Sequence, residues 1–284
     1  MRILKSDVGI MQGRLSETFG NKIQFFPKKN WEKEFQEAKK IGLNFIEWTL
    51  DYDDFRKNPI FLKSGLKKIQ FLKEKYKIDI KTLTGDCFMQ RPFWKINDNK
   101  HLLKDLESIV KACSKLKIKF IIFPLVDNSS IKNKKEEQKI INSLKKITPL
   151  LKKSKVLILF ESDYHPKKLK MFIKKFNKRY FGINYDTGNS AGLGYNIHEE
   201  FHAYGHYIKN IHVKDRILEG KTVRLGLGNA DFDKLFINLK KINYKNLLIL
   251  QTARAPNKKH KEEIIINVKY LYNKLSIFKK KNYL

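Results

Sequence analysis

Cysteine and long apolar runs are both scarce in this 284-residue sequence. The two cysteines, Cys87 and Cys113, do not have a metal-binding spacing, so neither a disulfide framework nor a cysteine zinc site is available. There is no run of 18 apolar residues that could cross a membrane, and the first seven residues lack the apolar stretch of a signal peptide. We therefore expect a cytoplasmic protein with reduced cysteines and no membrane partner.

Acidic residues are also few: 29 Asp and Glu face 60 Lys and Arg, a formal net charge of +31. Such a charge can attract nucleic acid. Only 8 of the 60 are arginine, however, and many lysines form adjacent pairs in segments that read as polar helix faces. This pattern, with many Asn and Ile, is typical of an AT-rich genome, so we expect no specific nucleic-acid partner. Non-specific polyanion binding is the alternative.

A glycine-rich dinucleotide fingerprint is absent, but short apolar, β-branched runs recur, each followed by turn residues and a lysine-rich amphipathic stretch. This alternation indicates repeated βα units, and with 42% hydrophobic residues the chain is not disordered. Eight units in a chain of this length favour one closed (β/α)8 TIM barrel over residues 1–284, with a short basic tail from about residue 279. The predicted strands are residues 8–15, 45–48, 80–85, 120–126, 156–161, 181–186, 208–213 and 247–251.

Polar side chains stand where these strands end, the edge at which such barrels place their active sites. Glu161, Asp186, His212 and Gln251 end the last four strands. Two carboxylates, an imidazole and an amide oxygen that converge on one point can bind a divalent cation, and this donor set suits Mn, Mg, Co or Zn. The sequence therefore predicts one metal ion bound by these four residues.

Longer motifs around these strand ends resemble the xylose isomerase-like family of sugar isomerases and epimerases, also called the AP endonuclease 2 superfamily. The resemblance spans nearly the whole chain. Residues 46–48, 51–56 and 84–93 are similar to the pentulose-5-phosphate 3-epimerase branch. The motifs are Phe160-Glu161-Ser162, Asn184-Tyr185-Asp186-Thr187-Gly188-Asn189, Ile211-His212-Val213-Lys214-Asp215-Arg216 and residues 225–232, Leu-Gly-Leu-Gly-Asn-Ala-Asp-Phe.

The resemblance implies that the matching Glu, Asp and His hold the metal and that the fourth ligand is normally a glutamate. This sequence has Gln251 there, whose carbonyl can bind a cation but whose amide cannot accept a proton. Epimerases of the family use one glutamate on each face of the carbon, so this departure favours an isomerase or a dehydratase that works through an enediolate with Glu161 as its single carboxylate base. Lys214 is the leading substitute if the protein is an epimerase. A non-catalytic sugar-binding barrel is a further alternative.

Arginine is informative because it is rare: six of the eight arginines fall at strand ends or in the following loops. Guanidinium groups suit phosphate or carboxylate, so we expect an anionic sugar as the substrate, although salt bridges at the rim are the alternative. The turn at residues 226–229 is a further candidate phosphate site. Aromatic residues near this face could stack on a sugar or belong to the core, and whether the protein forms a homo-oligomer stays open. The expected substrate-binding residues are Glu47, Arg91, Asn189, Arg216, Arg224 and Arg254.

The sequence gives less support to two other functions, a zinc protease and an abasic-site DNA endonuclease. His198-Glu199-Glu200-Phe201-His202 matches the H-E-x-x-H pattern of zinc proteases, but Ile208 stands where a metzincin has its third histidine, and the segment is expected to be the crossover helix after the sixth strand. The abasic-site endonucleases of the superfamily hold three zinc ions with additional histidines, whereas the corresponding strand ends here carry Glu47, Asp86 and Asn189.

Overall fold

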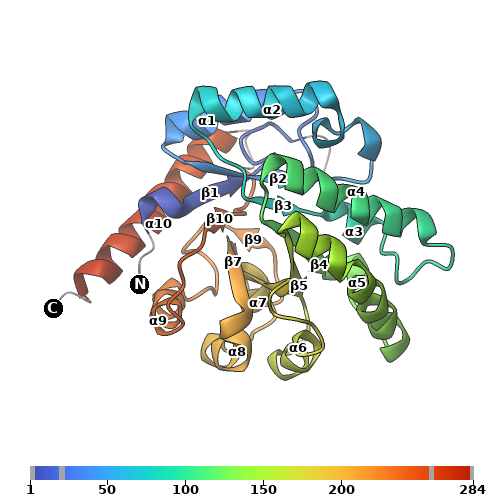
Figure 1. Cartoon of the computed structure of the whole chain (residues 1–284). Coiled ribbons are helices and arrows are strands. Elements are labelled where there is room, and N and C mark those ends of the chain that lie inside the picture. The colour runs from blue at the N-terminus through green and yellow to red at the C-terminus, as the bar shows by residue number, and fades with distance from the viewer. Residues whose placement is uncertain (1–3, 19–22, 256–258, 282–284) are drawn as a thin grey trace.

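Eight parallel strands close into a barrel in the computed structural model, which describes residues 4–18, 23–255 and 259–281. The order around the barrel is β1-β10-β7-β6-β5-β4-β3-β2, and Figure 1 shows the helices arranged around these strands. This confirms the predicted (β/α)8 TIM barrel. The barrel strands are β1 (Val8–Met11), β2 (Phe45–Thr49), β3 (Thr82–Thr84), β4 (Phe120–Leu125), β5 (Leu157–Ser162), β6 (Phe181–Asp186), β7 (Ile208–Val213) and β10 (Leu248–Leu250).

Each predicted run overlaps one barrel strand, and the largest difference in bounds is at β1. The strand ends at Met11 rather than at residue 15, because Gly13 turns the chain with a φ of +88°. A Cβ at Gly13 would lie 2.4 Å from the carbonyl oxygen of Phe25. Only glycine fits this position, which lets the segment around Phe25 pack across the end of β1.

Helices follow the strands and cover the barrel. The longer ones are α1 (Trp31–Ile41), α2 (Lys63–Tyr76), α4 (Lys100–Leu116), α5 (Lys134–Ser154), α6 (Pro166–Ile173), α8 (Ile197–Tyr204), α9 (Phe232–Lys241) and α10 (His260–Lys281). The segments α3 (Asp86–Gln90) and α7 (Thr187–Gly192) are short helices directly after β3 and β6, and β8 (Asp215–Arg216) pairs with β9 (Thr222–Val223) in an antiparallel hairpin. Single 3-10 turns span Lys5–Asp7, Phe55–Lys57, Pro59–Phe61, Asp127–Ser129 and Gly205–Tyr207.

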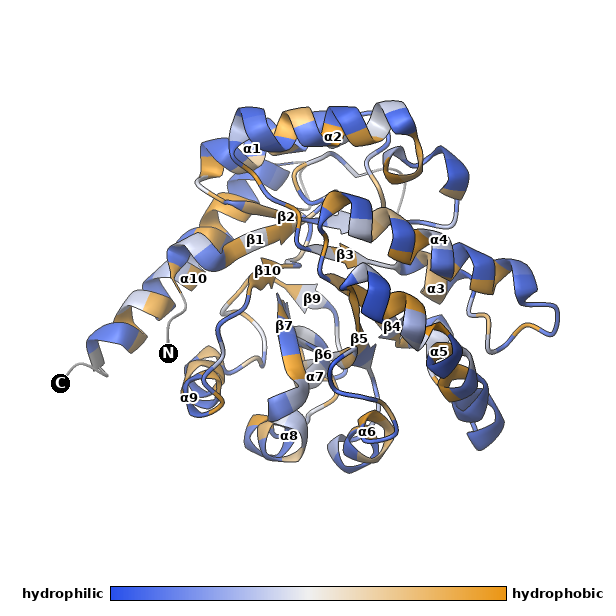
Figure 2. Ribbon diagram, in the orientation of Figure 1, coloured by the Kyte–Doolittle hydropathy of each residue, from blue (hydrophilic) through white to orange (hydrophobic). Residues whose placement is uncertain are grey.

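The helices are amphipathic, as the hydropathy colours in Figure 2 show. In α4 the side chains of Leu102, Leu106, Ile109 and Cys113 recur every three or four residues and are buried against the barrel. Adjacent lysine pairs such as Lys39-Lys40 and Lys145-Lys146 are exposed. The polar helix faces therefore carry much of the positive charge.

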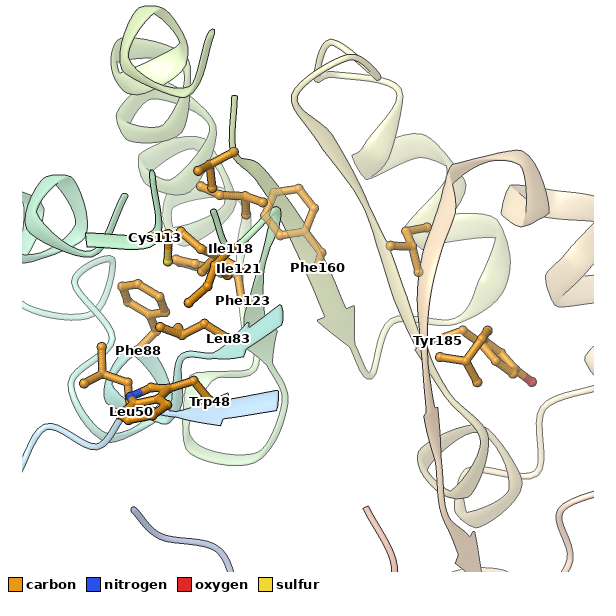
Figure 3. Close-up of a cluster of buried hydrophobic side chains, with 14 of the residues drawn as sticks. Trp48, Leu50, Leu83, Phe88, Cys113, Ile118, Ile121, Phe123, Phe160 and Tyr185 are labelled. Atoms are coloured by element: carbon orange, nitrogen blue, oxygen red, sulfur yellow. The ribbon is translucent and has the colours of Figure 1, made fainter. Parts of the chain in front are cut away.

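Large aromatic side chains fill the layer between barrel and helices (Figure 3). Phe88 stacks on Phe123 with ring centroids 4.5 Å apart, and Trp94 lies 5.4 Å from the same ring. The indole of Trp48 donates to Asn58 Oδ1 from a fully buried position. The aromatic residues that the sequence left open between sugar stacking and core belong to the core: Trp48, Phe88, Phe93, Trp94, Tyr164 and Tyr185.

Helix α10 runs through the position where the sequence predicts the start of a basic tail. It includes Lys279 and Lys280 and ends at Lys281, and residues 282–284 lie outside the described part of the chain. Among the described residues, none of the helices combines the length and the apolar character needed to cross a membrane.

Candidate active site

Three of the four expected metal ligands meet at the carboxyl ends of adjacent strands. Glu161 on β5, Asp186 at the end of β6 and His212 on β7 each offer one ligand atom within 4.8 Å of the others, and all three are buried. Asp186 and His212 are direct register partners between β6 and β7. In the described residues, this is the one cluster of three or more His, Cys, Asp and Glu side chains with such spacing.

The orientation of His212 suits a metal ligand. Its Nε2 lies 2.8 Å from Oε1 of Glu47, which is completely buried on β2. Its Nδ1 lies 2.9 Å from Oε2 of Glu161, but without the alignment of a hydrogen bond. Because Glu47 holds the Nε2 proton, the lone pair of Nδ1 can point at a cation between His212 and Glu161.

The structure gives Glu47 a neighbour that the sequence did not predict. The sequence assigns Glu47 to substrate binding, whereas the structure hydrogen-bonds its carboxylate to His212 and buries it completely. A carboxylate on the far nitrogen of a ligating imidazole fixes the tautomer and the ring orientation. Glu47 therefore acts on the site through His212.

The charges in this cluster shift its pKa values in opposite directions. Burial lowers the pKa of His212, but Glu47 and Glu161 outweigh it and raise the pKa to about 10. Burial raises the pKa of Glu161, but the close approach and positive charge of His212 outweigh it and lower the pKa. Two carboxylates thus keep a positive charge on the imidazole, and a divalent cation competes with a proton for such a nitrogen.

Asp186 has one oxygen fixed and one available. Its Oδ1 accepts the backbone N–H of Asn189 at 2.8 Å and caps α7. Its Oδ2 is buried without a hydrogen bond, although Nζ of Lys214 lies 2.9 Å away. Oδ2 of Asp186 and Nδ1 of His212 are buried, lack a hydrogen bond and lie in one cluster with Glu161, an arrangement that fits a divalent cation.

Gln251, directly after β10, is held at the same mouth. Its Oε1 lies 3.4 Å from Nζ of Lys214, and its Nε2 donates to Oε1 of Gln24 at 2.7 Å. Gln24 in turn donates to both carboxylate oxygens of Asp86, at 2.6 and 2.7 Å. The carbonyl of Gln251 therefore faces Lys214, which contacts Asp186, and its role as a fourth metal ligand stays a prediction.

Sequence reasoning missed two buried asparagines below the cluster. Asn184 donates to Oε2 of Glu161 at 2.6 Å, and Asn210 donates to Oδ1 of Asn184 at 2.8 Å. Strand periodicity could have found them, because each stands two residues before a candidate ligand, Asp186 or His212, and so shares its face. Gln24 was also missed. It lies in a loop, where no periodicity marks it.

The expected substrate-binding residues do not form one group. Asn189 donates to Oε1 of Glu161 at 2.9 Å, and Arg216 contacts Asn189 and the carbonyl of Gly220. Arg224 forms a two-pronged ion pair with Glu263 on α10. Arg91 is exposed and lies 5.1 Å from the ring of Tyr52. Asn189 and Arg216 thus lie next to the cluster, whereas Arg224 is held by its ion pair with α10.

The expected phosphate turn has a different structural role. The carboxylate of Asp215 is fully buried and accepts the backbone N–H groups of Gly226, Gly228 and Ala230 at 2.8 to 3.0 Å. These amides are the groups a phosphate would need. Since Asp215 already occupies them, the turn does not form a phosphate site in this structure.

The H-E-x-x-H segment is helical, as the sequence predicts. It lies in α8, after β6 and α7. Nδ1 of His198 lies within 3.3 Å of the side-chain amide of Asn238 on α9. Glu200 is buried and accepts from Tyr185 and Tyr204 at 2.8 and 2.7 Å. The segment therefore joins α8 to its neighbours.

A family model decides the classification. The model described as xylose isomerase-like TIM barrel matches residues 35–273. The chain belongs to this family. A comparison with curated proteins gave no significant sequence match.

Solved structures of the same fold cover almost the whole chain. The IOLI protein with a bound zinc atom superposes with a TM-score of 0.74 at 17% identity, over 96% of this chain and 99% of that one. A D-allulose 3-epimerase from Methylomonas sp. gives 0.73 at 12% identity, over 95% and 98%. A xylose isomerase-like TIM barrel protein from Mycobacterium smegmatis in complex with magnesium gives 0.69 at 11% identity, over 95% and 97%. At these identities the likeness shows the fold of this family member.

Proposed function

We propose that this family member is a metal-dependent isomerase or epimerase of a sugar, acting at a hydroxyl-bearing carbon next to a carbonyl group. One observation carries the proposal: the buried cluster of Glu161, Asp186 and His212, with Nδ1 of His212 freed by Glu47. The names of the neighbours, which include a D-allulose 3-epimerase and a zinc-bound protein, support the same reading. The finer likeness to the pentulose-5-phosphate branch remains a prediction.

The residues that would hold the metal are Glu161, Asp186, His212 and Gln251. Their oxygen and nitrogen donors suit Mn, Mg, Co or Zn. The chemistry that a divalent cation supplies in such a site is the stabilisation of negative charge on substrate oxygens.

Glu161 is the proposed base. Its Oε1 accepts from Asn189, and its Oε2 accepts from Asn184. These two hydrogen bonds fix the plane of the carboxylate. The neighbouring His212 and Lys214 lower its pKa, so the carboxylate is ionised and can remove the proton from the carbon next to the carbonyl to form an enediolate.

Opposite Glu161 the chain offers Gln251 and Lys214. The amide of Gln251 cannot take a proton. The ammonium group of Lys214 lies 2.9 Å from Oδ2 of Asp186, so it is placed to donate a proton rather than to remove one. A one-face reaction with Glu161 alone is therefore favoured, which means an aldose-ketose isomerase or the proton-removal step of a dehydratase. An epimerase would need Lys214.

The test is solvent exchange. Metal-loaded protein is incubated in heavy water with a panel of sugar phosphates, sugar acids and neutral ketoses, and deuterium uptake is read by NMR. Glu161→Gln should lower exchange by at least about 10² to 10⁴-fold, the usual contribution of a positioned base. Gln251→Glu should add or accelerate epimerisation while one-face isomerisation continues.

Two outcomes would contradict this assignment of roles. If the wild-type protein epimerises cleanly and Lys214→Met leaves the rate unchanged, another base faces Glu161. If Glu161→Gln binds metal and keeps exchange, the base lies elsewhere. Metal and sugar binding without exchange on any substrate would instead indicate a non-catalytic sugar-binding barrel.

A DNA-repair function is less well supported. The resemblance implies three zinc ions for such enzymes, and within the described ranges the structure shows one cluster suited to one ion. A DNA-binding titration at increasing salt separates the two, since phosphate neutralisation by the lysine-rich surface alone gives weak binding with a steep salt dependence.

A further inference from the structure

Two arginines share one acceptor at the mouth of the barrel. Arg14 follows β1 and Arg254 follows β10, and these strands are neighbours in the barrel. Nη1 of Arg14 and Nε of Arg254 both donate to the carbonyl oxygen of Ile23, at 2.5 and 3.0 Å. Arg14 is only 4% exposed, whereas Arg254 is half-buried. The pair is thus reachable from solvent through Arg254.

The two guanidinium groups have donors left over. Nε of Arg14 and Nη2 of Arg254 are buried and lack a hydrogen-bond partner among the described residues. Buried N–H groups of charged side chains are rarely left unpaired, because the lost hydration is expensive. Two such donors on adjacent arginines point to a missing acceptor.

Nearby carboxylates do not meet this need. Glu34 accepts from the backbone N–H groups of Gly13 and Leu15 and from the hydroxyl of Ser16, which leaves no ion pair with either arginine in the described structure. Burial and the charge of Arg254 lower the pKa of Arg14 to about 9, although the charges of Asp86, Asp186 and Glu34 oppose the shift. Two cations packed side by side without a paired anion are destabilising. The two arginines are therefore better explained as a site for a bound anion than as a contribution to the stability of the fold.

A buried histidine adds further unpaired nitrogen atoms. His260 opens α10, is 5% exposed, and has no hydrogen-bond partner at either ring nitrogen among the described residues. Burial lowers its pKa, and the charge of Arg254 lowers it further. The amino terminus of a long helix also favours an anion.

Gln24 connects this group to the candidate metal site. Its Oε1 accepts from Nη2 of Arg14 at 3.2 Å and from Nε2 of Gln251 at 2.7 Å. Arg14 is therefore two hydrogen bonds from a proposed metal ligand. A substrate whose reacting carbons lie at Glu161 could extend its charged end towards the arginines.

We propose that Arg14 and Arg254 form the anion subsite for the phosphate group of a sugar phosphate, an inference that rests on the proposed isomerase or epimerase function. Two guanidinium groups match the double charge and the oxygen geometry of a phosphate monoester better than the single charge of a carboxylate. The assignment differs from the expected set, in which Arg216 is the main anion contact. Arg216 donates to Gly220 and Asn189, and Arg224 pairs with Glu263.

The rarity of arginine makes a direct test feasible. The full chain is labelled with ¹⁵N-arginine, stripped of metal with EDTA, and titrated with inorganic phosphate at constant ionic strength. Its eight arginines give at most eight Nε–H signals, and Arg14→Lys and Arg254→Lys assign the two that matter. Sodium chloride controls for general screening of the +31 charge, and acetate tests a carboxylate ligand.

The expected result is a saturable shift of the Arg14 and Arg254 signals with phosphate. Arg254→Lys should weaken phosphate binding by about 10-fold or more, because lysine lacks the planar fork. Arg224→Lys is the matched control and should bind phosphate like the wild type. Thermal melting verifies that each variant is folded. If Arg14→Lys does not fold, the result for Arg254→Lys alone tests the subsite.

Two kinds of result would overturn the subsite. The first is a response to phosphate no larger than the response to chloride, or an Arg254→Lys variant with wild-type phosphate affinity. The second is saturation by acetate at the same concentration as phosphate, which would assign a carboxylate instead. Because metal is absent from this titration, its failure leaves the isomerase or epimerase proposal standing. Failure of metal binding or of deuterium exchange would not remove a phosphate response.

Discussion

The candidate metal site depends on His212, and the orientation of His212 depends on Glu47. His212 is completely buried between Glu47 and Glu161. Without Glu47 the imidazole could place its proton on either nitrogen. The metal-binding hypothesis therefore depends on a residue that does not itself face the metal.

Glu47→Gln tests this arrangement. A neutral amide holds the Nε2 proton more weakly and can itself donate to that nitrogen, which would move the proton to Nδ1. We expect affinity for Mn²⁺ or Zn²⁺, measured by isothermal titration calorimetry, to fall about 10 to 100-fold. His212→Ala should abolish tight binding.

Glu200→Gln is the matched control for that experiment. Glu200 is another buried glutamate, but it bonds to Tyr185, Ser190 and Tyr204 rather than to a candidate ligand. Its variant should keep metal affinity within about twofold while losing some stability. Wild-type metal affinity in Glu47→Gln would show that the tautomer is set by something else.

Among the elements, the loop after the β8–β9 hairpin shows how a buried carboxylate can shape a mouth loop. Asp215 in β8 accepts the amides of Gly226, Gly228 and Ala230. The two glycines serve this close approach: a Cβ on Gly228 would lie 2.3 Å from Oδ1 of Asp215, and Gly226 has a φ of +89°. The glycine pattern that resembled a phosphate turn is thus explained by an internal carboxylate.

Asp215→Asn should loosen this loop. The amide keeps one acceptor but directs its NH₂ group at backbone donors, so at least one buried N–H loses its partner. The expected cost is about 1 to 3 kcal/mol in the free energy of unfolding, with faster hydrogen exchange at Gly226 or Gly228. Asp233→Asn, which changes an exposed ion pair with Lys274, should cost less than about 1 kcal/mol. Equal stability of both variants would contradict this role.

For the molecule as a whole, Glu34 couples stability to pH. It lies in α1 and anchors the backbone after β1 through Gly13 and Leu15. Burial raises its pKa from 4.5 to about 7, although these hydrogen bonds oppose the shift. A carboxyl group whose pKa is raised in the folded state stabilises the fold when the pH is below the pKa that the group has in the unfolded state. That contribution is lost as the pH rises towards 7.

Glu34→Gln should therefore gain stability relative to the wild type between about pH 5 and pH 8. The variant resembles the protonated carboxyl group and has no proton to lose. The difference in unfolding free energy should move in its favour by on the order of 2 to 3 kcal/mol over this range, measured by urea unfolding at several pH values. A gap that stays constant with pH would show that Glu34 is ionised throughout.

Most of the architecture was readable in the sequence because it depends on local pattern. Apolar runs and amphipathic stretches fixed the number of βα units, and the bounds of β6 and β7 agree with the prediction. Strand ends also predicted that Glu161, Asp186 and His212 would meet, since parallel strands bring their carboxyl ends to one edge of a barrel. The strand ends that were misplaced, such as that of β1, lie where a single glycine turns the chain.

Only the tertiary structure decided which neighbours each polar group has. Glu47 contacts His212 across 165 positions of sequence, and Gln24 contacts Gln251 across 227. Arg14 and Arg254 come from opposite ends of the sequence, and they lie close together because β1 and β10 pair to close the barrel. Sequence periodicity reports which face of an element a residue occupies. Contacts between distant segments depend on barrel closure and loop packing. The tertiary structure was therefore needed to show the hydrogen-bond partners, the burial of charged groups and the ion pair of Arg224 with Glu263.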